Sequence, residues 1–367
     1  MNAATEADNV TMSAGYWLAT IGTKNVIDGA TPLVLDAIGN MQLDQASAFC
    51  FADMGCADGG SSMGLVRKAI ERVRANAAHR QVNVLYTDQP RNNYNSLFAI
   101  LHGIEDGPEP SYLNDYDGVF ATASGSSFYR QLCPDSTLDL GFSSTAMHWL
   151  SRKPCDISDY VQAVGASGHE LAEFQRQGHA DWRTILLQRA RELRPGGRLV
   201  LVNFCRDEED RYLGHTSGVD MFRMFNTLWQ EMVDDGSISG NEYSRMTLPQ
   251  YYHDVEEFSA PLIDHSSPVY QAGLRLESIH TRVVDCPYRI DFEQHGDSVR
   301  FARDYVPTLR SWTESTFAGG LDASRPAAER AELMERFYRT YAARVAADPK
   351  GHGMDYVHAY VVIRKEA

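Results

Sequence analysis

The stretch Ala52-Asp53-Met54-Gly55-Cys56-Ala57-Asp58-Gly59-Gly60 overlaps the end of an apolar run, Ala48–Met54, and precedes an amphipathic segment, Met63–Asn76. This order predicts a strand, a tight glycine turn and a helix. Open α/β sheets bind ligands just beyond the carboxyl ends of their strands, and glycines in such a turn let a ligand approach the backbone closely. The turn at residues 53–60 therefore predicts a cofactor site.

The acidic residues near this turn indicate which cofactor it holds. Asp53 suits a cationic ligand and is a poor neighbour for a pyrophosphate, and the dinucleotide pattern G-x-G-x-x-G is missing from this turn. A second acid, Asp88, follows the apolar run Val82–Tyr86, where its carboxylate can accept both ribose hydroxyls of an adenosine. The pair predicts S-adenosyl-L-methionine, which has a cationic aminopropyl part. An ordinary structural loop is the alternative, and Asp88 counts against it.

Around this turn, the first half of the chain alternates apolar runs with amphipathic segments. Such alternation predicts a parallel sheet with helices on both faces. The expected strands are Ala48–Met54, Val82–Tyr86, Gly118–Ala121, Leu138–Phe142 and Arg198–Phe204, and the expected helices are Met63–Asn76, Tyr94–Gly103 and Trp182–Leu193. Pro195-Gly196-Gly197 is interpreted as the stop of the last helix.

The second half of the chain is mainly helical in pattern. Residues 207–265 and 296–347 are expected to form a helical cap over the carboxyl edge of the sheet, while Leu274–Val284 and Tyr356–Ile363 are expected to be its last strands. No convincing linker flanks either helical block. We therefore predict a single domain over residues 1–367.

Composition excludes several classes of function. The formal net charge is −15, and the basic stretches near residues 67–74 and 189–198 are interrupted by acidic and apolar residues. Neither a nucleic acid nor an anionic membrane is an expected partner. The six cysteines are scattered without metal-ligand spacing, so no metal is expected. Without a secretory signal or a run of 18 apolar residues, the sequence favours a cytoplasmic protein.

Five motifs, in order, resemble those of the SABATH family of S-adenosylmethionine-dependent carboxyl and N-methyltransferases, the salicylate, jasmonate and indole-acetate carboxyl methyltransferase type. The resemblance implies a class I methyltransferase fold, an α/β Rossmann-like sheet of seven mostly parallel strands with a helical cap over the active site. It also implies a homodimer. The motifs are Ala52–Gly59, Tyr86–Phe98, Ser126–Pro134, Ser143–Ser151 and Arg189–Leu201.

The resemblance also implies roles for individual residues in holding the cofactor. Tyr16 and Thr20 would fold over it, and Asp53 and Gly55 would line its methionine side. Asp88 would hold the ribose and Gln89 the adenine edge, while Ser127 and Phe128 would bracket the adenine. Without the resemblance, Ser127 and Phe128 would be interpreted as an ordinary turn and a core aromatic residue.

For the substrate, the resemblance points first to His148 and Trp149, as the pair that presents ring N–H groups to a carboxylate. Thr23 stands where the carboxyl methyltransferases commonly have a Gln, and Thr145 where they have a Tyr, so both positions lose reach and bulk. Further expected pocket residues come from an approximate alignment, and a place in the core is an equal alternative for each: Met221, Phe222, Phe225, Tyr305, Thr308 and Trp312.

The expected activity is methylation of the carboxylate of a small organic acid to its methyl ester, with S-adenosyl-L-homocysteine as the second product. A carboxylate is already anionic at neutral pH, so no general base is expected. N-methylation of a purine-like or other heteroaromatic ring is the alternative within the family. A NAD-dependent oxidoreductase would need the missing dinucleotide pattern, and a non-catalytic relative would be expected to have lost Asp53, Asp88 or the His148-Trp149 pair.

Overall fold

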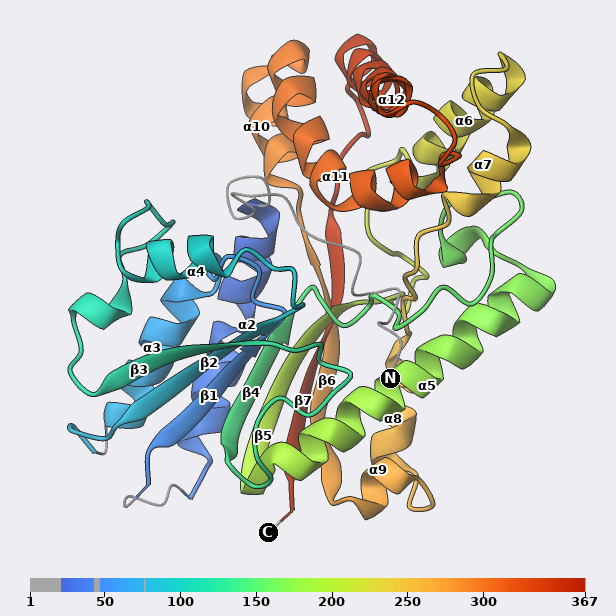
Figure 1. Ribbon diagram of the computed structural model, residues 1–367. Coiled ribbons are helices and arrows are strands. Elements are labelled where there is room, and N and C mark those ends of the chain that lie inside the picture. The colour runs from blue at the N-terminus through green and yellow to red at the C-terminus, as the bar shows by residue number, and fades with distance from the viewer. Residues whose placement is uncertain (1–20, 43–46, 76, 367) are drawn as a thin grey trace.

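The computed structural model describes residues 21–42, 47–75 and 77–366, and it contains a seven-stranded sheet (Figure 1). The strand order is β3-β2-β1-β4-β5-β7-β6, and among these strands β7 alone runs antiparallel to its neighbours. The strands are β1 (Phe49–Met54), β2 (Val82–Asp88), β3 (Val119–Gly125), β4 (Leu138–Ser144), β5 (Leu193–Phe204), β6 (Leu274–Val284) and β7 (Tyr356–Lys365). This arrangement confirms the predicted mostly parallel sheet of seven strands.

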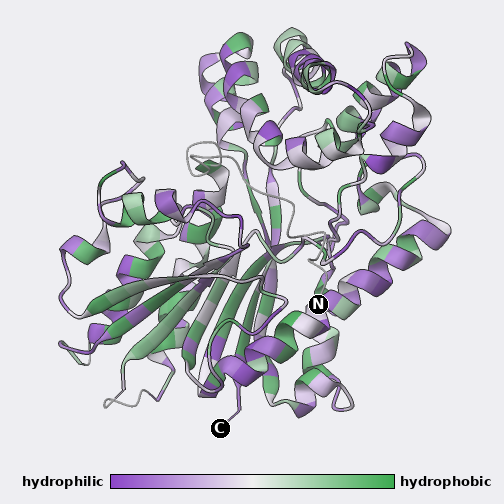
Figure 2. Cartoon of the chain, viewed as in Figure 1, coloured by the Kyte–Doolittle hydropathy of each residue, from purple (hydrophilic) through white to green (hydrophobic). Residues whose placement is uncertain are grey.

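Alternation along the central strands divides the core into two layers. Val200 and Val202 of β5 lie in the cluster formed with α2 (Ile21–Gly39), α3 (Met63–Arg74) and α4 (Tyr94–Leu101). Leu199 and Leu201 lie in a second cluster with α5 (Gly168–Glu192), α8 (Val255–Ile263) and α9 (Pro268–Gln271). Because successive side chains of a strand point to opposite faces, these helices cover the two faces of the sheet. The strands are mostly green in Figure 2, as expected for a sheet buried on both sides.

A cap of helices lies together above the carboxyl edge of the sheet (Figure 1). It consists of α6 (Met221–Asp234), α7 (Gly240–Arg245), α10 (Pro287–His295), α11 (Ser298–Gly320) and α12 (Ala327–Ala347). The structure places α8 against α5 and β6 on the sheet rather than in the cap, although its sequence lies in the block 207–265 that was expected to form the cap. Short 3₁₀ turns at Tyr112–Asn114 and Ala163–Gly165 complete the described elements.

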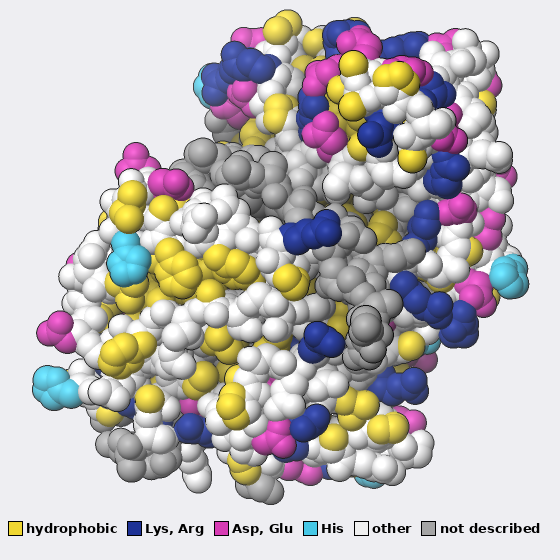
Figure 3. All heavy atoms as spheres, viewed as in Figure 1, with side chains coloured by type: hydrophobic (Ala, Val, Ile, Leu, Met, Phe, Trp, Pro, Cys, Tyr) yellow, Lys and Arg dark blue, Asp and Glu magenta, His cyan; other side chains and the backbone are white. Residues whose placement is uncertain are grey.

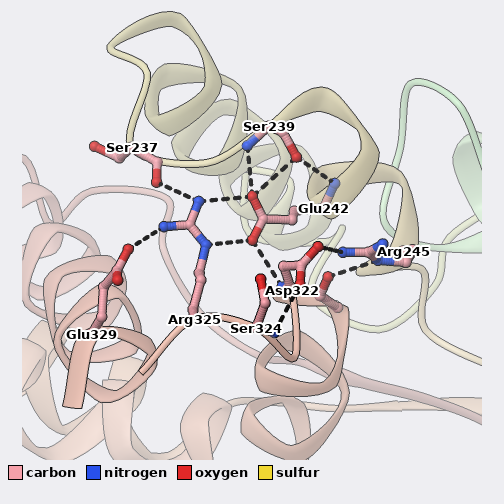
Figure 4. Close-up of polar contacts among 9 residues, drawn as sticks. Ser237, Ser239, Glu242, Arg245, Asp322, Ser324, Arg325 and Glu329 are labelled. Carbon is pink, nitrogen blue, oxygen red and sulfur yellow. Dashed lines mark hydrogen bonds and ion pairs between the residues drawn. The ribbon is translucent and has the colours of Figure 1, made fainter. Parts of the chain in front are cut away.

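One ion pair, between a half-buried arginine and a buried glutamate, joins parts of the cap (Figure 4). Arg325, before α12, donates to both carboxylate oxygens of Glu242 in α7, at 2.6 and 2.9 Å. The same carboxylate accepts the backbone N–H groups of Ser239 and Asp322, both at 2.8 Å. These contacts lower the pKa of Glu242, with the Arg325 hydrogen bond as the largest cause. The pair joins α7 to the connection between α11 and α12.

Two expectations about elements differ from the structure. Helix α5 begins at Gly168, well before the expected start at Trp182. The sequence did not predict its first turns because they are polar and show little of the apolar period of a helix. Pro195-Gly196-Gly197 does not follow the helix as a loop but lies inside β5, where the pairing with β4 shifts register between Leu138 and Leu140. Gly196 has φ of +80° there, as suits a bulge that accommodates a proline. The helix α2 was not anticipated.

Candidate active site

A candidate ligand site is the cavity at the carboxyl ends of β1, β2 and β4, where the strand order reverses. It has about 1050 Å³ of empty space, part of it open to solvent, and we call it the outer cavity. Sheets of this topology bind ligands at this point. The described residues that line it are Thr23, Ile27, Asp53, Gly55, Cys56, Ala57, Ser61, Ser62, Thr87, Asp88, Gln89, Asn92, Ser126, Ser127, Phe128, Phe142, Ser144, Thr145, Ala146 and Trp149.

The turn after β1 brings backbone to the wall of this cavity. The N–H of Gly55 donates to the carbonyl of Thr87 at 2.8 Å, which ties the turn to the end of β2. Gly55 has φ of +81°, and a Cβ at this position would lie 2.5 Å from Cβ of Ala146. Glycine is therefore required here both by the backbone conformation and by the close approach of the loop after β4.

Two carboxylates, those of the buried Asp53 and the half-buried Asp88, face the outer cavity without a cationic side chain. Burial, together with the nearby charge of Asp88, raises the pKa of Asp53 to about 7, against the lowering effect of the hydrogen bond that the Ser62 hydroxyl donates at 2.6 Å. Burial also raises the pKa of Asp88, against hydrogen bonds from the N–H groups of Ala57 (2.8 Å) and Gln89 (2.7 Å). Among the described lining residues none is Lys or Arg. A cationic ligand would supply the missing charge partner.

The residues present fit S-adenosylmethionine. Besides the two acids, Gln89 lines the cavity, and its Oε1 atom is buried without a hydrogen-bond partner among the described residues. A buried acceptor of this kind is expected to have a partner, and an amino group on an adenine edge would be one. Within the described residues, no group of His, Cys, Asp and Glu is placed to hold a metal ion.

The loop that carries Ser127 and Phe128 is fixed by a buried ion pair at the end of α5. Arg189 and Glu192 are both fully buried and joined at 2.6 Å. Arg189 also donates to the carbonyls of Phe128 and Arg130, at 2.8 and 2.7 Å, and Glu192 accepts the N–H of Leu132. The charges are thus satisfied by backbone groups of one loop, which sets the position of that wall of the outer cavity.

A smaller cavity, which we call the inner cavity, lies between the sheet and the cap. It has about 370 Å³ of empty space and shares Thr23, Thr145 and Trp149 with the outer cavity. Its other described lining residues are His148, Phe204, Leu213, Gln250, Trp312, Met354 and Tyr356. It is mostly apolar and aromatic, as is usual for a small-molecule pocket, with a few polar groups.

His148 is a neutral group in this cavity. It is buried between aromatic rings, with its ring centroid 4.7 Å from that of Phe204, and burial lowers its pKa to about 3. Its Nδ1 atom has no hydrogen-bond partner among the described residues. A neutral imidazole has one N–H donor and one acceptor. His148 can therefore donate a hydrogen bond to a ligand at pH 7 but brings no positive charge.

Thr145 lies where the two cavities meet, in a strained conformation. Its φ is +57°, a region that β-branched residues rarely adopt. Its N–H donates to the carbonyl of Val202 at 2.8 Å, and its hydroxyl lies 3.1 Å from Nε2 of the buried His358. These contacts hold the strained residue in place at the boundary between the cavities.

Most of the expected site residues that the structure describes lie in these two cavities. Asp53, Gly55, Asp88, Gln89, Ser127 and Phe128 line the outer cavity, His148 and Trp312 the inner one, and Thr23, Thr145 and Trp149 both. Tyr16 and Thr20 lie outside the described residues.

Five expected pocket residues lie elsewhere. Met221, Phe222, Phe225 and Tyr305 are buried in the cap core, where Phe225 packs on Trp312 and Tyr305 stacks on Phe301. Thr308 bonds the hydroxyl of Tyr288 at 3.1 Å and lines a separate groove on the cap. These residues were expected in the pocket because α6 and α11 each carry an apolar stripe. In the structure, both stripes are buried against each other and against α12, so these residues pack within the cap and do not line the inner cavity.

Sequence reasoning missed several residues of the inner cavity. Gln250 lies in Pro249-Gln250-Tyr251, a stretch with weaker similarity to the SABATH family than the five motifs, and that similarity could have drawn attention to it. Met354 lies just before β7, and Tyr356 is the first residue of that strand. Tyr356 joins the site because β7 pairs antiparallel with β5. No local sequence pattern predicts that strand pairing.

Comparison with known proteins identifies the relatives of this chain. A family model described as SAM-dependent carboxyl methyltransferase matches residues 14–366. Indole-3-acetate O-methyltransferase 1 of Arabidopsis thaliana is 25% identical over 62% of this chain and 64% of its own length. Salicylate carboxymethyltransferase of Clarkia breweri is 29% identical over 59% of this chain and 60% of its own length. The chain thus spans less than two thirds of the length of these curated relatives.

A solved structure shows the same fold. Loganic acid methyltransferase with SAH superposes with a TM-score of 0.75 at 19% sequence identity, covering 97% of this chain and 99% of that one.

Proposed function

The chain belongs to the family of SAM-dependent carboxyl methyltransferases, and from this premise we propose that it methylates the carboxylate of a small organic acid to give its methyl ester. The names of three relatives contain indole-3-acetate, salicylate and loganic acid, and the acid that we propose is of the same size class. The methyl donor of the family is S-adenosylmethionine.

One observation supports this proposal above the others. The acidic outer cavity and the apolar inner cavity meet at Thr23, Thr145 and Trp149. A cationic cofactor in the first and an acid in the second would face each other across that boundary. Trp149 lies at the boundary and His148 next to it, so an acid positioned by both has its carboxylate directed toward the outer cavity.

Different residues would bind the cofactor and surround the acid. When bound, S-adenosylmethionine supplies a methyl group already activated by its positively charged sulfur. Asp53 would pair with the cationic part of the cofactor and Asp88 would accept its ribose hydroxyls, with Gln89, Ser127 and Phe128 at the adenine. Phe204, Trp312 and Tyr356 would exclude water from the acid, which strengthens every electrostatic interaction inside.

The chain does not need to remove a proton from the acid. A carboxylate is ionised at neutral pH. His148, with a pKa near 3, is neutral at that pH and is too weak a base to act as a general base. Its neutral ring and the Trp149 indole would orient the carboxylate by donating hydrogen bonds. Neutral donors orient an anion without holding its attacking oxygen as firmly as a cation would.

We also propose that the protein is cytoplasmic and forms a homodimer. All six cysteines are free, which suits a reducing compartment. None of the described helices combines the length and the apolar character needed to cross a membrane. Apolar side chains gather over β1–β3 on the face shown in Figure 3. Phe120 of β3 is 53% exposed. That face is available to a second copy, and sedimentation equilibrium should give twice the mass of one chain.

Two measurements test the proposed activity. Isothermal titration should show binding of S-adenosylhomocysteine, and absence of binding contradicts the assignment of the outer cavity. A screen of small acids with S-adenosylmethionine should then yield methyl esters by mass spectrometry. Products methylated only on nitrogen would replace the carboxyl activity with the N-methyltransferase alternative.

A further inference from the structure

The inner cavity has to hold an acid without any cationic side chain. Its described lining residues include no Lys, Arg, Asp or Glu, and His148 is neutral at pH 7. A carboxylate moved into such a place is stable only if it accepts hydrogen bonds. Thr23, at the boundary of the two cavities, is short. A further neutral donor in the inner cavity would therefore matter for the binding of the acid.

Gln250 is held beside the His148-Trp149 pair by a short antiparallel bridge. The N–H of Leu150 donates to the carbonyl of Pro249 at 2.8 Å, and the N–H of Tyr251 donates to the carbonyl of His148 at 3.0 Å. Trp149 and Gln250 are directly opposite in this bridge. Side chains directly opposite in an antiparallel pair lie on the same face, and both of these line the inner cavity.

The hydrogen bonds behind Gln250 fix which end of its carboxamide faces the cavity. The hydroxyl of Tyr252 donates to Oε1 of Gln250 at 2.9 Å. This is the one hydrogen bond of the Gln250 side chain among the described residues, and it occupies the acceptor end. The Gln250 side chain is almost fully buried, at 1% exposure, so water cannot satisfy the other end as it would on a surface. The Nε2 group is left to donate into the cavity.

Gln162 supports this direction from behind Tyr252. Its own Oε1 accepts the N–H of Val164 at 2.6 Å, so its amino end is the one free to act on Tyr252. Burial raises the pKa of Tyr252, and the neighbouring Gln162 side chain lowers it. Gln162 Nε2 has no hydrogen-bond partner among the described residues. A donor on that side still favours a Tyr252 hydroxyl proton that points at Gln250.

We propose that Gln250 binds the carboxylate of the acceptor acid through its Nε2–H group, that Tyr252 is the positioning residue that sets its orientation, and that the substrate is a monocarboxylic acid with an apolar body. The inference rests on the proposed function and extends it to a substrate-binding residue. A second carboxylate would have no partner among the aromatic and aliphatic walls, which excludes dicarboxylic acids.

The test is the affinity of the protein, saturated with S-adenosylhomocysteine, for indole-3-acetate and for benzoate, measured by isothermal titration. Q250M removes the donor at similar volume and should weaken binding of the acid at least about tenfold, as expected for a hydrogen bond to a charged group. Q250E keeps the shape and the acceptor for Tyr252 but not the donor, and should weaken it at least as much. Y252F should have a smaller effect.

Controls separate this role from a structural one. Q230M changes an exposed glutamine of α6 and should leave both affinities unchanged. All variants should bind S-adenosylhomocysteine as the wild type does. In a double-mutant cycle, Y252F should add little to Q250M, since the hydroxyl acts through the carboxamide. If Q250M does not bind S-adenosylhomocysteine, the cycle of Q250E with Y252F gives the same comparison.

The outcomes for this inference and for the proposed activity are distinguishable. Unchanged acid affinity in Q250M and Q250E, or a wild type that binds neither acid, overturns the role of Gln250. Acid binding that depends on Gln250 without ester formation from any acid overturns the activity and leaves the binding role. Tight binding of succinate overturns the restriction to monocarboxylic acids.

Discussion

Asp88 connects two loops that line the outer cavity. Its two oxygens accept N–H groups from Ala57 and Gln89, so it fixes both the turn after β1 and the start of the loop after β2. Each carboxylate oxygen keeps a lone pair for a ligand. This residue therefore serves the shape of the cavity and the contact with the cofactor together.

We predict that D88N weakens S-adenosylhomocysteine binding by about 100-fold. The amide brings an NH₂ group to face a backbone N–H, and it removes a charged acceptor for the ribose hydroxyls, each effect amounting to about 1–3 kcal/mol. Isothermal titration checks the affinity. D117N, the same change on the surface, is the matched control, and equal affinity of D88N and wild type would count against Asp88 as the ribose ligand.

Asp53 should make the ligand-free protein less stable as the pH rises. Burial holds its folded-state pKa near 7, above the unfolded value of 3.8. The folded chain therefore keeps a proton that the unfolded chain has lost, so the stability from this group is complete below pH 4 and is lost as the pH rises through 7.

The variant D53N should remove that dependence. We expect its free energy of unfolding to exceed that of the wild type by about 2–4 kcal/mol at pH 8 and by little at pH 4.5, because three pKa units correspond to about 4 kcal/mol. Its affinity for S-adenosylhomocysteine should fall. Urea unfolding at both pH values measures the difference. D36N, an exposed change on α2, is the control, and parallel pH profiles for D53N and wild type would refute the assignment.

At the scale of elements, α5 both covers the sheet and positions the cofactor loop. Its last turn carries the fully buried Arg189–Glu192 pair that binds the backbone of the loop at Phe128–Leu132. A buried ion pair of this kind adds little net stability, but removing one partner leaves an uncompensated charge.

We predict that R189M destabilises the fold by about 3–5 kcal/mol and weakens S-adenosylhomocysteine binding, since the loop loses two carbonyl contacts. The double variant R189M/E192L should recover part of the stability but not the affinity, because no donor remains for the loop. Thermal unfolding and titration give the two readouts. R191M, an exposed arginine on the same turn, should change neither, and recovery of affinity in the double variant would contradict the loop-positioning role.

The sequence predicted elements well where one pattern decided them. The bounds of β6 are those expected, and β1 and β2 differ by one or two residues at one end. It failed where a contact with another strand decided the outcome. Pro195 looks like a helix stop in isolation, but a bulge against β4 lets β5 continue through it, and that bulge depends on the partner strand.

At the scale of the whole molecule, the sheet and the cap contribute to different cavities. Strand ends and their turns make most of the outer cavity, while the cap adds Trp312 to the inner one. Asp355, just before β7, joins the two parts. Its carboxylate accepts hydrogen bonds from the Ser217 hydroxyl at 2.7 Å, from the backbone N–H of Cys286 at 2.7 Å and from the guanidinium of Arg289 at 3.1 Å. Because the cap contributes to the inner cavity and the strand ends to the outer one, changes in the cap should alter the choice of acid without altering the binding of the cofactor.

We predict that W312A leaves the affinity for S-adenosylhomocysteine within about twofold and lowers kcat/KM for the smallest accepted acid by about 10- to 100-fold. The loss of an aromatic wall removes about 1.5–3 kcal/mol of apolar contact, while the larger cavity should admit bulkier acids. Ester formation across a size series checks this. Phe317, a cap aromatic away from both cavities, offers F317L as a control, and an unchanged size preference in W312A would be contrary to a specificity role for the cap.

By itself the sequence determined the cofactor half of this protein. The glycine turn at 53–60, Asp88 and the motif at Ser127 and Phe128 all lie at or near strand ends, and parallel strands bring such ends to one edge of a sheet whatever the details of packing. These residues indeed line one cavity. The physical reason is that local patterns fix strands, and strand direction fixes where their ends meet.

Only the tertiary structure decided which further residues complete the inner cavity. Phe225 and Trp312 belong to the same apolar surface of the cap, yet only Trp312 lines the cavity. Gln250, Phe204 and Tyr356 are far apart in sequence and meet because of an isolated bridge and one antiparallel strand pair. A helix stripe shows which side chains are buried, but which of them border a cavity depends on how neighbouring elements pack. The turn at 53–60 is determined locally, whereas the pocket it faces is determined by the assembled cap and sheet.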